Sequence, residues 1–118
     1  MAIFSTGPIE NNPVFGVRPT QTVTVLIDCA GNEIMTNVLV QGYYLLGGTR
    51  NLYVSEDVSI GSGQVVTNSY YANLDALEFV FTVNDAVSDQ LRVSVWGKSG
   101  TGELVTAHRI ITYEKYQQ

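Results

Sequence analysis

The sequence predicts an all-β domain, a jelly roll or β-sandwich of about eight antiparallel strands that begins with an extended N-terminal arm. Three observations predict this fold. Apolar and polar residues alternate along most of the chain, and no helical periodicity is present. Turn residues interrupt the alternation at short intervals, as in sandwiches and barrels. The chain has 118 residues, 45% of them apolar, which suits one domain with a single modest core.

The first part of the body is predicted to hold three strands. Residues 21–28 form the first, and residues 28–32 form a turn. Residues 33–46 form a long second strand, in which Gly42 predicts a β-bulge or kink that changes which side chains point inward. Gly47-Gly48 then closes a hairpin into residues 51–60. The inward faces are expected to be Val23, Val25 and Ile27; Ile34, Val38, Val40 and Tyr44; and Leu52, Val54, Val58 and Ile60.

The second part of the body repeats the pattern. Strands are predicted over residues 64–72 and 76–83, over the stretch that begins at Leu91, and over residues 104–113. Residues 84–90 form a polar loop, residues 97–102 form a hairpin turn, and residues 114–118 form a polar tail. The inward faces are expected to be Val66, Tyr70 and Ala72; Leu77, Phe79, Phe81 and Val83; and Leu91, Val93 and Val95.

Residues 1–19 differ from the body, residues 20–118, because prolines, glycines and asparagines separate two small apolar clusters. Extended, nineteen residues reach up to ~60 Å. Three interpretations are open: a frayed terminus, a strand in the chain's own sheet, or a strand donated to a neighbouring subunit. We favour donation, with residues 1–19 as a connector. Its expected subunit contacts are Ala2, Ile3, Phe4, Ser5, Ile9, Val14 and Phe15.

Composition excludes several partners. Only 14% of the residues are charged, against roughly 25% in an average domain, which suits close contact with other chains. The net charge of −5 and six scattered basic residues argue against nucleic acid and against anionic membranes. No apolar run is long enough to be inserted in a membrane, and the N-terminus lacks the pattern of a Sec signal.

No pattern for catalysis, cofactor binding or metal binding stands out, so we expect neither an enzyme nor a cofactor. The single histidine, His108, has no nucleophile motif beside it. One histidine and one cysteine are poor material for a zinc site. Cys29 is the only cysteine, so it cannot form an internal disulfide; it either pairs two subunits or is a small buried side chain, and burial is the favoured interpretation.

Three aromatic residues that we expect on a sheet face, Tyr43, Tyr71 and Trp96, allow two interpretations. They suit subunit interfaces, because Tyr and Trp bury a large area and keep a polar group. They would also suit the stacking platform of a carbohydrate-binding module. That module, a ligand-binding β-sandwich, is the alternative function.

The stretches "FSTGPIENNPVFGVRPTQTVTV" and "SVWGKSGTGELVTAHRI" resemble small spore-surface proteins, the endospore appendage subunits of spore-forming bacilli. The resemblance implies a jelly-roll subunit that self-assembles into a spore-surface fibre, each N-terminal arm docking on an adjacent subunit by strand addition. It also implies a homopolymer made without a Sec signal and anchored by a spore-coat or exosporium protein. Without that resemblance, a cytoplasmic location would be expected.

One departure from that family bears on how a fibre would be held. The best-known appendage subunits carry cysteines in the connector and body that cross-link the fibre. The connector of this chain has none. A fibre of this chain would therefore depend on strand pairing and apolar anchors.

Overall fold

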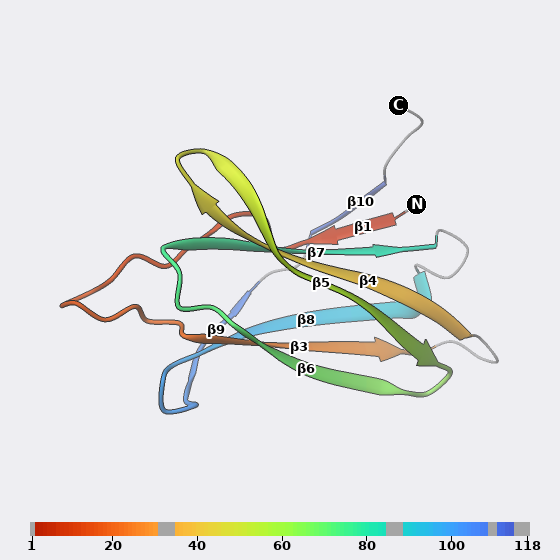
Figure 1. Cartoon of the computed structure of the whole chain (residues 1–118). Coiled ribbons are helices and arrows are strands. Elements are labelled where there is room, and N and C mark those ends of the chain that lie inside the picture. Colours follow the sequence, from red (N-terminus) through yellow and green to blue (C-terminus); the bar gives the residue numbers. More distant parts are fainter. Residues whose placement is uncertain (1, 31–34, 85–88, 109–110, 115–118) are drawn as a thin grey trace.

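The computed structural model describes residues 2–30, 35–84, 89–108 and 111–114, and side chains within these ranges except those of Met35 and of residues from 106 onward. The described chain is almost entirely β-structure and forms two antiparallel sheets that pack face to face (Figure 1). The all-β sandwich is therefore confirmed, whereas its jelly-roll variant stays a prediction. No helix of the described residues is long and apolar enough to cross a membrane.

Ten strands are present in the described ranges. Their bounds, in chain order, are β1 Ala2–Ser5, β2 Ile9–Glu10, β3 Thr22–Cys29, β4 Met35–Leu46, β5 Thr49–Gly61, β6 Val65–Tyr71, β7 Ala76–Val83, β8 Leu91–Lys98, β9 Leu104–His108 and β10 Ile111–Glu114. The larger sheet has the order β10-β1-β7-β4-β5, with β2 also paired to β7. The smaller sheet has the order β6-β3-β8-β9.

The core lies between the sheets and contains most of the residues that alternation placed inward, but neither Tyr44 nor Leu52. Strand β7 is the clearest case: it occupies the predicted residues, and its four alternate apolar side chains are fully buried. Val66 and Tyr70 pack against this core from β6, and Val93 does so from β8. The buried apolar set at its centre is Val23, Val25, Ile27, Val38, Val40, Ile60, Leu77, Phe79, Phe81, Val83 and Val95.

Gly42 marks a bulge, as predicted, but one consequence was predicted wrongly. The register between β4 and β5 shifts between Gly42 and Tyr43. Beyond the shift, Leu52 is paired with Tyr43 and is half exposed, whereas Tyr53 packs against the core. The expected inward position of Leu52 is therefore wrong, because the extra residue in β5 reverses the faces of this strand.

Strand β3 runs one residue further than predicted, because Cys29 belongs to the strand and is completely buried. The expected turn over residues 28–32 is wrong at its first two positions. Burial of Cys29 as a small side chain is confirmed. Of the expected inward set, Ile34 lies outside the described residues.

Candidate functional site

The structure places the N-terminal strand in the chain's own larger sheet. Strand β1 lies between β7 and β10 and pairs with both in antiparallel register. All four of its residues are buried. Of the interpretations open from sequence, this conformation matches a strand in the chain's own sheet, so that in the isolated chain residues 2–5 are part of the body.

The side chains of β1 divide between two faces. Ala2 and Phe4 join the hydrophobic core. Ile3 and Ser5 alternate with them on the other face of the sheet, and both are buried there. Two of the three apolar side chains of β1 are therefore anchored in the core.

A polar chain crosses the outer face of the larger sheet and ends on β1. The hydroxyl of Ser5 donates a 2.8 Å hydrogen bond to one carboxylate oxygen of Glu78. The other oxygen accepts a 2.6 Å hydrogen bond from Nε of Arg50, in an ion pair. The side chain of Glu78 is only 6% exposed, so its charge depends on these two partners. Sequence alternation placed Glu78 outward but gave no sign that Ser5 and Arg50 would cover it.

The short strand β2 continues along β7 and is followed by a loop. Hydrogen bonds hold both ends of this loop to the body. Ile9 pairs with Leu77 and packs against the core. Next, the buried amide of Asn11 donates to the carbonyls of Thr20, Ala72 and Leu74 at 2.6, 3.1 and 3.0 Å. Its oxygen accepts the backbone N–H of Thr20 at 3.0 Å. The asparagines of the arm were predicted to break its strand geometry; instead Asn11 joins both ends of the loop to the body.

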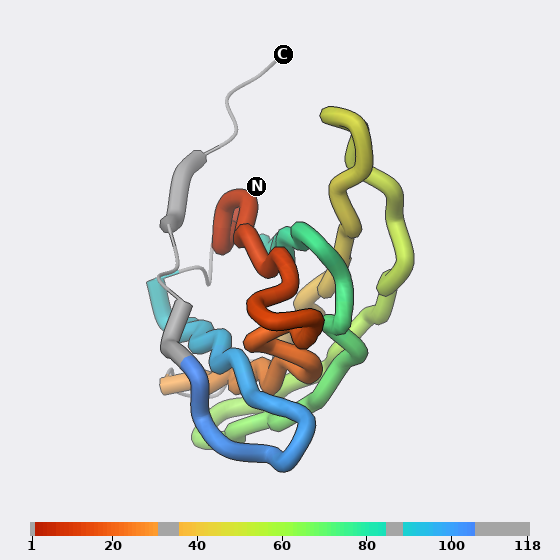
Figure 2. Tube along the Cα trace, turned by 90° about the vertical axis from the view of Figure 1, so that its left-hand side faces the viewer, coloured from red at the N-terminus to blue at the C-terminus, as the bar shows by residue number. Residues whose placement is uncertain are grey.

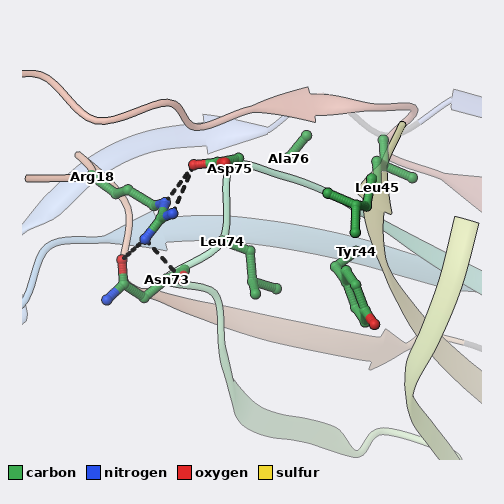
Figure 3. Close-up of a pocket in the computed structure, with 8 residues that line it drawn as sticks. Arg18, Tyr44, Leu45, Asn73, Leu74, Asp75 and Ala76 are labelled. Atoms are coloured by element: carbon green, nitrogen blue, oxygen red, sulfur yellow. Dashed lines mark hydrogen bonds and ion pairs between the residues drawn. The ribbon is translucent and has the colours of Figure 1, made fainter. Parts of the chain in front are cut away.

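Arg18 makes a second set of contacts that hold the same loop to the body. Its Nε and Nη2 both donate to Oδ1 of Asp75, at 2.9 and 2.7 Å. Its Nη1 donates to the side-chain oxygen of Asn73 at 3.2 Å (Figure 3). The base of the loop is therefore held to the segment between β6 and β7 from two sides.

The tip of the loop is a tight two-residue turn that exposes apolar side chains. Val14 and Val17 exchange both backbone hydrogen bonds, at 2.8 and 3.1 Å. Between them, Phe15 and Gly16 have φ angles of 52° and 79°, and two successive positive values are the mark of a type I′ turn. The Phe15 side chain is fully exposed, and both valines are more than half exposed. The expected contact residues Val14 and Phe15 therefore touch nothing that would bury them in the isolated chain.

This loop lies at one end of the sandwich. In Figure 1 it projects to the left, and Figure 2 looks onto the same end, where the segment runs between the β4–β5 and β8–β9 hairpins. Beside it is an open pocket of about 160 Å³. Its lining is Arg18, Tyr44, Leu45, Leu46, Asn73, Leu74, Asp75 and Ala76 (Figure 3).

The three candidate interface aromatics do not form one platform. Tyr43 lies on β4 of the larger sheet, whereas Tyr71 and Trp96 lie on β6 and β8 of the smaller sheet. Strand β3 separates the last two: Thr22 pairs with Tyr71, and Thr24 pairs with Trp96 two residues further along. Only Tyr71 is largely exposed, while the other two are partly buried.

Within the described residues, no group of three or more His, Cys, Asp or Glu side chains is placed to hold a metal ion. The side chain of His108 lies outside that description. No family model, no curated protein and no solved structure matches this chain.

Proposed function

We propose that this protein is a structural subunit that assembles with copies of itself by exchange of strand β1. One observation carries the proposal: a four-residue strand fills a slot between β7 and β10 and is joined to the rest of the chain by residues 6–8. A neighbour's β1 could fill the same slot with the same contacts, which is the route of domain swapping. The resemblance to endospore appendage subunits supports a fibre on the spore surface, anchored there by a coat or exosporium protein.

The contacts of β1 give such an exchange both affinity and register. Main-chain pairing on two edges supplies affinity, and Phe4 supplies an apolar anchor. A shift by one residue would turn Phe4 out of the core and move Ser5 away from Glu78. The joint contains Gly7, whose φ of 66° favours glycine, followed by Pro8. This local break in strand geometry is a natural position for a hinge.

Cysteines placed at Ile3 and Thr82 test the exchange directly. These residues face each other in the β1–β7 register, at a separation that suits a disulfide. If β1 is exchanged, oxidation of the assembled double variant gives a covalent ladder on a non-reducing gel, because each subunit donates one strand and receives one. If β1 stays in its own chain, only a cross-linked monomer forms, and the proposal is wrong. The single variants Ile3→Cys and Thr82→Cys are the controls, with buried Cys29 common to all.

Deletion of residues 1–15 would be a less decisive test than the cysteine pair. It removes Ala2 and Phe4 from the core and the contacts of Asn11, so loss of assembly could follow from loss of folding. The cysteine pair leaves these contacts in place. Electron micrographs of the purified chain would then show whether the products are fibres or closed rings.

A further inference from the structure

We infer that the Phe15 turn is a docking element for a second copy of this chain, whose pocket beside Leu45, Leu46, Leu74 and Ala76 receives the ring. The contact belongs to the self-assembly proposed above but uses neither β1 nor its slot. It joins the ends of two sandwiches, whereas strand exchange joins their larger sheets.

The turn presents Phe15 in a fixed position. Two cross-strand hydrogen bonds close the tip, and Asn11 and Arg18 fasten the base. A side chain held in this way loses little freedom on binding, which favours affinity. The ring is 102% exposed and its backbone has a positive φ, a conformation that is uncommon for a bulky residue. An exposed ring in an unfavourable backbone conformation contributes nothing visible to the stability of the single chain.

The pocket is large enough for the ring and has both apolar and polar walls. Its volume is about 160 Å³, and an apolar cavity of about 150 Å³ is large enough to bind benzene. Leucine and alanine side chains form much of the wall, and Arg18 and Asp75 lie along it as a salt bridge (Figure 3). A guanidinium beside an aromatic ring adds a favourable cation–π contact.

The position of both features favours a reciprocal contact. Although Arg18 lines the pocket, the full exposure of Phe15 shows that the ring does not enter the pocket of its own chain. The N-terminal loop and the segments that line the pocket, residues 44–46 and 73–76, nevertheless lie at the same end of the sandwich, as the trace in Figure 2 shows. Two copies that meet end to end can therefore each place a ring in the other's pocket, and a contact of this kind closes as a two-fold dimer. Leu46, which is 67% exposed, would become covered on the same face.

The variant Phe15→Asn removes the ring without harming the turn. Asparagine accepts positive φ, and Asn-Gly is the preferred pair for a type I′ turn. We expect the end-to-end association, measured on the full chain by sedimentation, to weaken roughly 150- to 25,000-fold, because the reciprocal dimer loses two buried aromatic side chains. Thermal stability at low concentration should be unchanged or higher. Association of equal strength in the variant would overturn the inference.

Mixed cross-linking locates the contact. An equimolar mixture of Phe15→Cys and Leu46→Cys full chains should form a disulfide-linked heterodimer. A mixture of Phe15→Cys with Val65→Cys should not, because Val65 is 56% exposed but begins β6 at the opposite end of the sandwich (Figure 1). Equal yields from the two mixtures would contradict the docking site. The Phe15–Leu46 link tests the docking site, whereas the Ile3–Thr82 link tests strand exchange. One link can therefore be absent while the other forms.

A membrane is the other surface that an exposed apolar tip could enter. The net charge of −5 disfavours anionic lipid, so the probe is a vesicle of neutral phosphatidylcholine. Sedimentation of the native chain with these vesicles, lost in Phe15→Asn and accompanied by no self-association, would assign the tip to lipid and overturn the inference. The inference requires that neither the native chain nor Phe15→Asn binds these vesicles.

Discussion

Asn11 allows a sharp test of how the N-terminal segment is attached to the body. The variant Asn11→Ala removes the two N–H donors of Nδ2, which are shared among three carbonyls, and the acceptor Oδ1. Each donor or acceptor that is satisfied is worth about 1 kcal/mol net. The carbonyl of Ala72 also accepts the N–H of Leu74 at 2.8 Å, so losing Asn11 does not leave that carbonyl unpaired. We therefore expect a loss of about 3 kcal/mol in the free energy of unfolding, the sum for two donors and one acceptor.

Urea denaturation measures this loss as a lower midpoint at an unchanged m-value. In thermal unfolding, about 3 kcal/mol corresponds to roughly 12 °C for a chain of this size. The measurement is made at two protein concentrations, because a contribution from assembly would make the midpoint depend on concentration.

The neighbouring residue supplies the matched control. Asn12 is exposed, and its side chain donates one exposed hydrogen bond, to Glu10 at 2.7 Å. Asn12→Ala should change the stability by no more than about 0.5 kcal/mol. If Asn11→Ala costs less than about 1 kcal/mol, or no more than Asn12→Ala, then the segment is not pinned as the contacts indicate.

Two further predictions concern the body. Gly42→Ala places a Cβ 3.0 Å from both the Phe79 ring and Cβ of Val54, so thermal unfolding should show a loss of about 1–3 kcal/mol; an unchanged midpoint would mean that the bulge relaxes freely. Burial is the main factor that raises the pKa of Tyr53 and of Tyr70 from 10.0 to about 12. Because the unfolded chain loses these protons first, stability should be intact below pH 10 and fall between pH 10 and 12. Unfolding followed by circular dichroism should show this decline, and Tyr53→Phe should make it shallower.

Alternation was sufficient to predict the core because it reports burial on one side of a sheet. Strand β7 lies on the predicted residues and has the predicted inward face. Alternation does not predict the inward face where a strand is irregular. Gly42 predicted a bulge, but sequence could not say on which strand the extra residue would lie, and Leu52 was therefore assigned to the wrong face.

Polar residues of the candidate site were harder to predict, because their roles depend on partners distant in sequence. Asn11 contacts the carbonyls of Ala72 and Leu74, some sixty residues away, yet an asparagine between glycines and prolines has the local character of a turn. Ser5 and Glu78 are 73 residues apart. The Val-Phe-Gly-Val stretch was the one local signal for the exposed tip. A two-residue pair that ends in glycine, with a valine on each side, is compatible with a hairpin turn.

The contacts of the N-terminal segment also limit how β1 could be exchanged. The sequence predicted residues 1–19 as the connector. Asn11 and Arg18 oppose movement of this whole segment, because it would break the hydrogen bonds of Asn11 to the β6–β7 segment and the ion pair with Asp75. The hinge that costs least lies before Asn11.

Residues 6–8 then form the whole joint, because Ile9 and Glu10 stay paired with β7, and three residues span at most about 11 Å. The Phe15 turn stays on its own body while β1 leaves. Strand exchange is therefore restricted to neighbours whose larger sheets lie close together, and Phe15 remains available for the end contact. Asn11→Ala discriminates between the two hinges: it should promote exchange if the whole arm must be released, and should leave the Ile3–Thr82 ladder unchanged if the hinge lies at Gly7 and Pro8.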